Sequence, residues 1–344
     1  MKVLVTGSQG YIGTVLTEIL LKKKYNVIGY DVGFFKENVI GFLKENYKVI
    51  QKDIRDLNEN DLKNVDAIIH LAGLSNDPLG EFSPLLTEQI NYEATKKIAN
   101  LAKNCGVTRF VYASSQSMYG ISNTSEELDE DNSIKNPVTA YAKAKWDAEL
   151  YLNGLNTNDF IVTSFRPSTV FGVSNRLRCD VVFNNLVACA YTTGKIEIKS
   201  DGSPWRPVIH VRDVCSAFIA GLEAPPKLVA GKSFNVGIRN GNYTVKDLAE
   251  AAQKAVPGSE LIFTGEHSDP RTYKVSFQRI LKTLSNHYKP EWDLDRGGKE
   301  LVDFFKKIKF SESQFRGRST TRLSQLLYLN ENNQLDKSLR FKQN

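Results

Sequence analysis

The sequence predicts an α/β fold, in which a doubly wound parallel sheet is followed by a smaller α+β portion. From residue 1 to about residue 165, short apolar segments such as KVLVTG and VDAIIHLAG alternate with longer helical patterns such as YIGTVLTEILLKKK. This alternation is typical of a parallel sheet covered by helices on both faces, and the nearly continuous apolar strands fit burial on both sides. Beyond residue 172 the rhythm breaks, and short strands mix with helices.

Each element follows from a local pattern. Apolar runs rich in β-branched residues predict strands, and longer segments with apolar residues at helical spacing predict helices. Pro257 ends the predicted helix 243–257. The predicted strands are 2–7, 26–31, 47–53, 65–73, 109–115, 160–172, two short ones within 195–211, and 260–265. The predicted helices are 11–24, 91–106, 140–155, 180–194, 212–225, 243–257 and 277–286.

The same patterns predict three parts of the chain. Residues 1–172 form the main α/β domain, and a segment from about 208–240 returns to it. Residues 173–310 form the mainly α+β portion, and residues 311–344 are a C-terminal extension. The apolar run LSQLLYL within the extension indicates that it docks either on the body of the protein or on a partner subunit.

Composition excludes several classes of protein. The net charge of +6 is mild, and the basic residues do not cluster with aromatic side chains, which argues against nucleic-acid binding. The four cysteines form no C-x-x-C pair or zinc-site spacing, so we expect no metal, and thiols buried in a reducing compartment. A strand at the N-terminus leaves no room for a signal peptide, and no run of ~18 apolar residues could span a bilayer. We therefore expect a cytoplasmic protein. The cysteines are Cys105, Cys179, Cys189 and Cys215.

The first strand leads into the glycine-rich segment VTGSQGYIG, which opens the first helix. Gly7 permits a tight turn, Gly10 lets the backbone approach a diphosphate, and Gly13 allows the helix to pack close to the strand. The helix N-terminus, with Tyr11 and Ile12, then offers unpaired N–H groups to the phosphates. This spacing between strand and helix predicts a Rossmann-type dinucleotide site.

Acidic residues at the ends of the next strands complete the predicted cofactor site. Asp31 lies 18 residues after Gly13, where a carboxylate accepts hydrogen bonds from the adenosine ribose and repels a 2′-phosphate. No arginine follows within ten residues, so we predict NAD rather than NADP; the alternative is that Asp31 caps the following loop. Asp53 and Ile54 are expected near the adenine. Leu71, Ala72 and Gly73 of HLAG are expected at the middle of the cofactor, with His70 serving strand packing.

The segment TAYAKAK sets Tyr141 four residues before Lys145, which places both side chains on one face of a helix. The two groups could therefore share one site, with Lys143 projecting elsewhere. A phenol with a pKa near ~10 is a poor base at neutral pH, and a neighbouring ammonium would favour its ionisation. The alternative is an ordinary solvated amphipathic helix.

Taken together, the ordered motifs GSQGYIG, HLAG, ASSQSMYG, YAKAK, FRPSTVFG and DGSPWRPVIHVRD resemble those of the extended short-chain dehydrogenases/reductases, in the nucleotide-sugar epimerase/dehydratase branch. The resemblance covers residues 1 to about 281. It implies that Tyr141 is the acid/base and that Lys145 lowers its pKa and holds the nicotinamide ribose. It also implies that Ser115 hydrogen-bonds the same sugar oxygen and stabilises negative charge there.

The two residues after Ser115 depart from one branch of the family. Related 4,6-dehydratases carry an Asp-Glu pair at this place, which drives loss of water. Here the pair is Gln116 and Ser117, which offers no acid to protonate a leaving hydroxyl and no carboxylate base. This difference argues against dehydration.

The resemblance also implies a set of substrate contacts. Arg206 matches an arginine that pairs with the substrate diphosphate, a role that suits a guanidinium, although it could instead cover a strand edge. Thr169 stands where relatives usually have asparagine, and Asn185 could cap its helix rather than touch a ligand. The expected substrate-binding residues are Ser75, Ser115, Gln116, Ser117, Thr169, Arg178, Asn185, Arg206 and Arg271.

The family resemblance implies an NAD-dependent nucleotide-sugar epimerase, acting at C4 through a transient 4-keto sugar. Two alternatives stay open: a 4-dehydrogenase or 4-ketoreductase with net redox chemistry, which would use the same three residues, and a non-catalytic NAD-binding protein. The last is disfavoured because Ser115, Tyr141 and Lys145 are all present. The resemblance further implies a homodimer, formed through two surface helices that include the one carrying Tyr141.

Overall fold

A seven-stranded parallel sheet forms the centre of the protein. The computed structural model describes residues 1–122, 126–265 and 272–342. Every neighbouring pair in the sheet is parallel, with register partners such as Val5 and Ile69, so the predicted doubly wound α/β fold is confirmed. The strand order is β11 (Lys232–Val236), β7 (Ile161–Pro167), β5 (Arg109–Ala113), β4 (Ala67–His70), β1 (Lys2–Thr6), β2 (Asn26–Asp31) and β3 (Lys48–Gln51).

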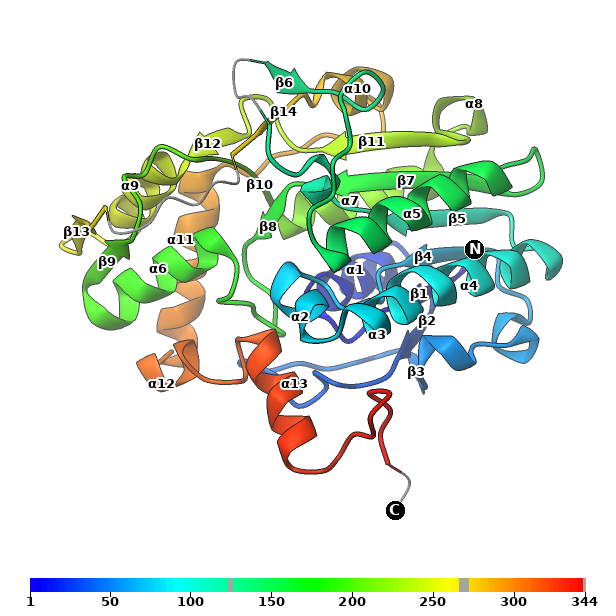
Figure 1. Ribbon diagram of the computed structural model, residues 1–344, viewed down its shortest axis with the longest axis horizontal. Helices are drawn as coiled ribbons and strands as arrows, with labels where there is room; N and C mark the ends of the chain where they lie inside the picture. The colour runs from blue at the N-terminus through cyan, green and yellow to red at the C-terminus, as the bar shows by residue number, and fades with distance from the viewer. Residues whose placement is uncertain (123–125, 266–271, 343–344) are drawn as a thin grey trace.

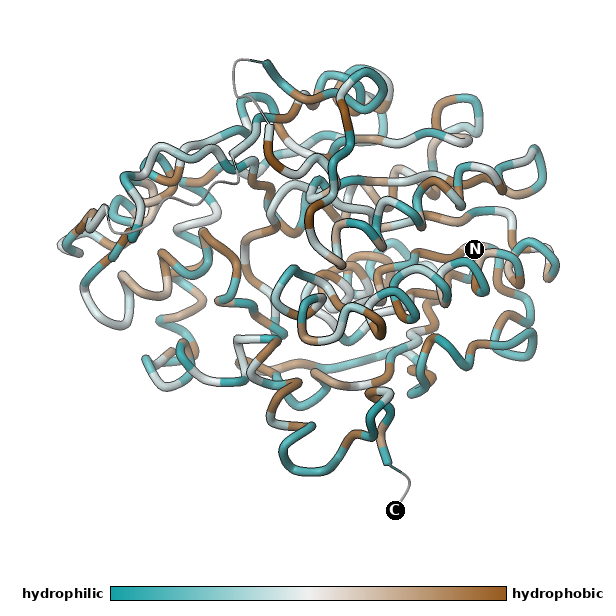
Figure 2. Tube along the Cα trace, viewed as in Figure 1, coloured by the Kyte–Doolittle hydropathy of each residue, from teal (hydrophilic) through white to brown (hydrophobic). Residues whose placement is uncertain are grey.

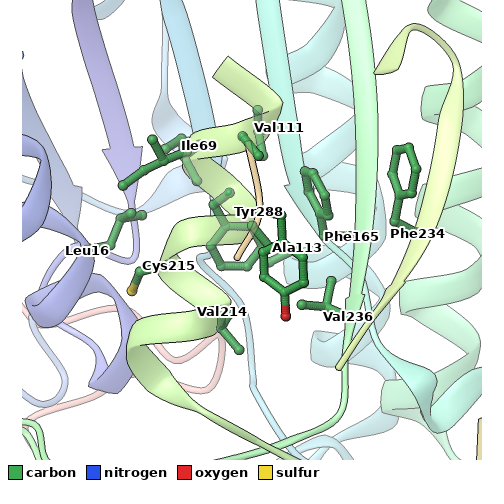
Figure 3. Packing of buried hydrophobic residues seen from close by; sticks show 14 of the residues in the cluster. Leu16, Ile69, Val111, Ala113, Phe165, Val214, Cys215, Phe234, Val236 and Tyr288 are labelled. Atoms are coloured by element: carbon green, nitrogen blue, oxygen red, sulfur yellow. The ribbon is translucent and has the colours of Figure 1, made fainter. Parts of the chain in front are cut away.

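Helices cover both faces of this sheet (Figure 1). Helices α1 (Tyr11–Lys22) and α7 (Val211–Glu223) pack on one face, and α4 (Ala94–Asn104) and α5 (Ala140–Leu155) pack on the other. Figure 3 shows Leu16 of α1 near Ile69 of β4, in the same buried cluster as Val214 of α7 and Phe165 of β7. Hydrophobic residues follow the central strands and the inner helix faces, whereas hydrophilic residues dominate the outer turns (Figure 2).

A smaller portion with its own core lies beside the large sheet (Figure 1). Its two small sheets are β12-β10-β8 and β13-β9, and its helices α6, α9 and α11 pack against one another. The bounds are β8 (Thr169–Phe171), α6 (Val182–Thr193), β9 (Lys195–Ile198), β10 (Trp205–His210), β12 (Asn242–Thr244), α9 (Val245–Ala255), β13 (Glu260–Phe263) and α11 (Leu294–Ile308).

The strand β11 and several short elements were not predicted from the sequence, whereas α10 lies within the predicted helix 277–286. The Asn76 side chain caps the start of α2, and the Ser83 side chain caps the start of α3. Helix α3 continues directly into a π-helical turn at Gln89–Glu93. Six residues or fewer give too short a pattern for a periodicity to be read. The remaining elements are α2 (Asp77–Phe82), α3 (Pro84–Glu88), β6 (Glu127–Leu128), α8 (Pro226–Val229), β14 (Lys274–Val275), α10 (Gln278–Thr283), α12 (Glu312–Phe315), and 3-10 turns at Ile54–Asp56, Glu59–Leu62 and Gln116–Tyr119.

The expectation of four buried thiols is wrong for two of them. Cys179 and Cys215 are buried, but Cys105 is exposed and Cys189 is half-buried. The reason is local, because Cys105 ends α4 at a turn on the surface and Cys189 lies at the edge of the apolar face of α6. Within the described part of the chain, no helix is long and apolar enough to cross a membrane.

The C-terminal extension docks on the body of the protein. Helix α13 (Arg322–Glu331) buries Leu326 and Leu329, and the chain after it buries Leu335 and Leu339. All four side chains belong to the core cluster beneath β2, β4 and α4. Figure 1 shows this segment, in red, along the edge of the sheet that carries β2 and β3.

Candidate functional site

One cavity of about 680 Å³ collects the predicted site residues. It lies at the carboxyl ends of β1, β2, β4, β5 and β7, which is where ligands bind in doubly wound sheets. Its volume falls within the ~300–1,000 Å³ of ordinary ligand sites. The predicted residues that line it are Gly7, Gly10, Tyr11, Ile12, Gly13, Asp31, Asp53, Ile54, Leu71, Ala72, Gly73, Ser75, Ser115, Gln116, Ser117, Tyr141, Lys145, Thr169, Arg178 and Arg206.

Two predicted residues are not part of this lining. Asn185 is exposed on α6 and donates a hydrogen bond from Nδ2 to the carbonyl of Cys179 at 2.8 Å. It does not cap the helix either, because the N-cap residue is Val181 and no side chain caps it. It does not line the cavity, because its position on α6 faces solvent. Arg271 lies outside the described residues.

The glycine-rich turn has the shape that a diphosphate requires. Gly7 has φ of 72°, and a Cβ there would lie 2.8 Å from the backbone nitrogen of Ala72. A Cβ on Gly13 would lie 2.1 Å from the carbonyl oxygen of Gly7. Gly10 begins α1 without a side-chain cap, so the positive end of the helix is left for a ligand anion. The Tyr11 hydroxyl is used internally, because it donates to the Gly172 carbonyl at 2.7 Å.

Asp31 both orders its loop and faces the cavity. Its carboxylate accepts from the backbone N–H of Gln9 at 2.9 Å and of Gly33 at 2.8 Å. Burial raises its pKa, and these two hydrogen bonds oppose that rise. Arg176 is the arginine whose charge reaches Asp31, but its guanidinium pairs with Glu45 at 2.9 Å. The carboxylate therefore fits a ribose diol, and the neighbouring cation is already neutralised.

The next two strand ends carry residues with internal partners. The Asp53 carboxylate forms a salt bridge with Arg55 at 2.6 Å and also accepts from the Arg55 backbone N–H at 2.8 Å. His70 is fully buried between the Thr6 and Thr95 hydroxyls, at 2.7 and 2.8 Å. Burial lowers the pKa of His70 to about 3, so the ring is neutral and serves packing, as predicted.

Helix α5 presents Tyr141 and Lys145 to the cavity and Lys143 to solvent. Thr139 fixes the start of the helix, because its hydroxyl accepts from the Ala142 N–H at 3.1 Å. Lys145 is 5% exposed and donates from Nζ to the Ala113 carbonyl at 2.7 Å. Burial lowers the pKa of Lys145 to about 8. The two residues therefore share one site rather than a solvated helix face.

The electrostatics of Tyr141 differ from the prediction. Burial raises the pKa of its phenol above the ordinary value. A hydrogen bond with Ser115 and the charge of Arg178 oppose this rise, whereas the Asp77 carboxylate adds to it. The Lys145 ammonium is directed at the Ala113 carbonyl at the end of β5. Ser115 and Arg178 are therefore two groups that favour the phenolate at this place, and the role predicted for Lys145 stays a prediction.

Ser115 and Gln116 lie at the end of β5, beside Tyr141. The Ser115 hydroxyl caps a 3-10 turn by accepting from the Ser117 N–H at 3.1 Å. Gln116 is 1% exposed, and its Nε2 donates to the Arg166 carbonyl at 3.0 Å. Its Oε1 has no hydrogen-bond partner among the described residues. The cavity is thus lined by a buried carboxamide whose acceptor is unused.

Arg178 dominates the charge of the substrate side. It is 8% exposed, pairs with Asp180 at 2.8 Å, and donates to the Ser75 hydroxyl at 3.4 Å. Thr169 and Arg206 line the same region from β8 and β10. An arginine in this position suits a phosphate ligand.

Sequence reasoning missed several residues that line the cavity. Asn76 and Asp77 follow β4, and the only local signal was the helix-start pattern NDP. Asp180 forms the ion pair with Arg178. Arg322, from the C-terminal extension, had no motif around it and no sequence neighbour in the site.

Comparison with known proteins agrees with this geometry. The chain is 28% identical over 322 residues to UDP-glucose 4-epimerase of Mycolicibacterium smegmatis, covering 89% of this chain and 99% of that protein. It is 28% identical over 337 residues to UDP-glucuronic acid decarboxylase 4 of Arabidopsis thaliana, covering 93% of this chain and 72% of that protein. Among solved structures, UDP-glucuronic acid 4-epimerase from Bacillus cereus, in complex with UDP-glucuronic acid and NAD, has a TM-score of 0.73 at 22% identity, covering 90% of this chain and all of that one.

A family profile covers more than half of the chain. Residues 3–237 match the family described as "NAD dependent epimerase/dehydratase family", and this span includes the glycine-rich turn, Asp31, Ser115, Tyr141 and Lys145. The family consists of NAD-dependent enzymes, in keeping with a glycine cradle and a ribose-facing carboxylate in the cavity. The chain therefore belongs to the NAD dependent epimerase/dehydratase family, and NAD is its cofactor.

Proposed function

We propose that the protein is a nucleotide-sugar 4-epimerase. The observation that carries the proposal is the convergence of Ser115, Tyr141 and Lys145 at the cavity that also holds the glycine-rich turn. These residues supply a proton carrier, a hydrogen-bond donor and a cation at one place. An enzyme that oxidises a sugar hydroxyl and reduces it again needs these groups beside its NAD.

The residues of the cavity fit NAD in an extended arrangement. The N-terminus of α1, with Gly10, Tyr11 and Ile12, would hold the diphosphate. Asp31 would accept from the adenosine ribose hydroxyls, and Lys145 would donate to the nicotinamide ribose. When bound, NAD supplies the redox chemistry by accepting a hydride from sugar C4 and giving it back.

Tyr141 would act as the proton carrier at the C4 oxygen. Its phenolate takes the proton from the C4 hydroxyl, and its phenol returns the proton when the hydroxyl forms again. The Ser115 hydroxyl donates to the same oxygen and stabilises negative charge on it. The Arg178 charge and the Ser115 hydrogen bond both lower the pKa of Tyr141, which counters the effect of its burial. Burial still leaves the pKa of the phenol above its ordinary value, so these two groups offset the rise in part.

Gln116 and Ser117 support epimerisation over dehydration. Both side chains line the cavity next to Ser115, where a dehydratase would need an acid and a base. A carboxamide and a hydroxyl cannot protonate a leaving hydroxyl or remove a carbon-bound proton at neutral pH. The second candidate is a 4-dehydrogenase or 4-ketoreductase, which the same three residues would serve.

The substrate would be a nucleotide-diphosphate sugar. The charge of Arg178, together with Arg206 and Thr169, offers a diphosphate the contacts it requires. The homodimer and the cytoplasmic location stay predictions. Leu85 of α3 and Leu150 of α5 are exposed apolar side chains on helices that contact each other, a surface suited to such a dimer.

The test is a panel of UDP-, dTDP-, GDP- and CDP-sugars, incubated with the purified protein and followed by NMR. An epimerase converts one C4 epimer into the other with catalytic NAD and accumulates no NADH. A net dehydrogenase instead produces NADH in step with a 4-keto sugar. If no pair of C4 epimers interconverts in the presence of NAD, the proposal is wrong.

A further inference from the structure

Arg322 is a buried cation that the proposed chemistry does not use. It is the first residue of α13 and lies in the C-terminal extension, beyond the residues 3–237 that match the family. Its side chain is 1% exposed, yet it lines the cavity together with Thr321 and Leu323. The extension therefore contributes a charged group to the site.

The extension holds Arg322 against the adenosine side of the cavity. Gln325 Nε2 donates to the Phe34 carbonyl at 3.1 Å, and the Phe341 ring lies 5.7 Å from the Phe34 ring. Arg340 forms an ion pair with Asp56. These contacts are all to the loops that follow β2 and β3, which also carry Asp31 and Asp53 (Figure 1). The buried leucines of α13 make this attachment part of the core.

The immediate contacts of Arg322 leave one nitrogen unused. Nη2 donates to the Arg176 carbonyl at 2.6 Å, and the guanidinium lies 4.7 Å from the centre of the Phe35 ring. Nη1 has no hydrogen-bond partner in the part of the chain that the structure describes. Arg176 in turn donates to the Thr14 hydroxyl at 3.2 Å, in the first turn of α1. Arg322 thus lies against the segment that follows β2, and Arg176 links this region to α1.

The local charges leave a positive excess. Three buried arginines lie together, and the first two have carboxylate partners, Glu45 for Arg176 and Asp180 for Arg178. Among the described residues, no salt bridge joins the Arg322 guanidinium to a carboxylate, although the Arg322 backbone N–H donates to Asp180 at 3.3 Å. Burial, followed by the charge of Arg178, lowers the pKa of Arg322 to about 9. An uncompensated buried cation is costly, so a ligand anion would stabilise this arrangement.

We propose that Arg322 binds the diphosphate of the dinucleotide cofactor, and that the C-terminal extension closes over the cofactor through this contact. The nucleotide sugar also carries a diphosphate, but Arg322 lies against the Phe35 ring, and Gln325 of the same helix binds the Phe34 carbonyl. Both contacts are to the segment directly after Asp31, which places Arg322 at the cofactor end. The inference rests on the NAD dependence of the family and is independent of the reaction proposed above. A guanidinium suits this ligand because it can donate two parallel hydrogen bonds to phosphate oxygens.

The test compares ligand binding by Arg322→Met, Arg322→Lys and wild type, without a sugar substrate. Calorimetry on protein freed of nucleotide would use NAD, adenosine and UDP as separate probes. We expect Arg322→Met to bind NAD about 10- to 100-fold more weakly, as loss of a charge-assisted hydrogen bond predicts, with adenosine and UDP binding unchanged. Arg322→Lys keeps the charge but cannot donate two parallel hydrogen bonds, so its NAD affinity should lie between those of Arg322→Met and wild type.

The control is Arg316→Met, an exposed arginine of the same extension that pairs with Glu312. It should bind all three probes as the wild type does. Arg322→Met removes a buried charge, so its thermal unfolding should occur no earlier than that of the wild type. Unchanged NAD binding, an equal loss for adenosine, or a loss for UDP in place of NAD would each overturn the proposal. Because no turnover is measured, absence of epimerase activity would leave the result intact.

Discussion

Replacing Lys145 with methionine should change how the stability of the NAD-free protein depends on pH. The ammonium is 5% exposed, and burial lowers its pKa from 10.5 to about 8. This difference corresponds to about 3 kcal/mol that opposes folding while the group is charged. Methionine has a similar length, carries no charge and suits the surroundings of the Tyr112 ring, which lies 4.9 Å from the Lys145 ammonium.

The direction of the effect follows from the two pKa values. The unfolded chain keeps this proton up to about pH 10.5, whereas the folded protein releases it near pH 8. The penalty is therefore fully present below pH 8 and is relieved as the pH rises to 10.5. Between about pH 7 and pH 9.5, about 2 kcal/mol of the penalty should disappear. Over that range, the stability of Lys145→Met relative to the wild type should fall by that amount.

Urea unfolding of both proteins at the two pH values, followed by circular dichroism, measures this difference. The hydrogen bond from Lys145 to the Ala113 carbonyl contributes to the difference in unfolding free energy between the two proteins at any one pH. Only the charge of Lys145 makes that difference change with pH. Lys143→Met is the matched control, because Lys143 is exposed on the same helix and its removal should leave the pH dependence of stability as in the wild type. A gap between Lys145→Met and wild type that stays constant across the range would refute the assignment of Lys145 as a buried cation.

Three further substitutions test the site. Tyr141→Phe should lower turnover by about 10²- to 10⁴-fold, the usual contribution of a general acid/base, and isothermal titration should show NAD binding unchanged; full activity would exclude Tyr141 as the proton carrier. Gln116→Met removes the unused Oε1 acceptor and should lower kcat/KM about tenfold through a lost substrate hydrogen bond, with NAD affinity retained; unchanged kcat/KM would mean that the substrate does not use this group. Gly13→Ala would place a Cβ 2.1 Å from the Gly7 carbonyl oxygen, so α1 must shift, and both the Tm and the NAD affinity should fall; an unaltered Tm would contradict the close packing of the turn.

Local patterns were sufficient for the main features of the fold. Six of the seven strands of the main sheet and the glycine-rich turn could be predicted, because apolar runs, glycine spacing and helical periodicity depend on residues close together in the chain. The edge strand β11 was missed. The pairing of Tyr141 with Lys145 is of the same kind as these local patterns, because two residues spaced four apart on a helix lie on the same face, whatever the rest of the chain does. The short helices after β4 were missed because a segment of five or six residues, α2 and α3 among them, carries no period that can be read.

Other properties of the site depend on contacts between distant parts of the chain. Spacing alone paired Lys145 with the Tyr141 phenol, but the fold directs the ammonium at Ala113 and brings Ser115 and Arg178 to the phenol. Arg322 has no recognisable motif and enters the cavity because the leucines of α13 bury themselves against the main sheet. The pKa of each ionisable group also depends on how deeply the group is buried, and burial is set by the packing of the whole chain. Sequence therefore specified the types of groups and their local order, whereas folding set their partners, their exposure and the pKa values that follow, because those arise from residues distant in the chain, from 32 positions for Lys145 and Ala113 to 146 for Arg322 and Arg176.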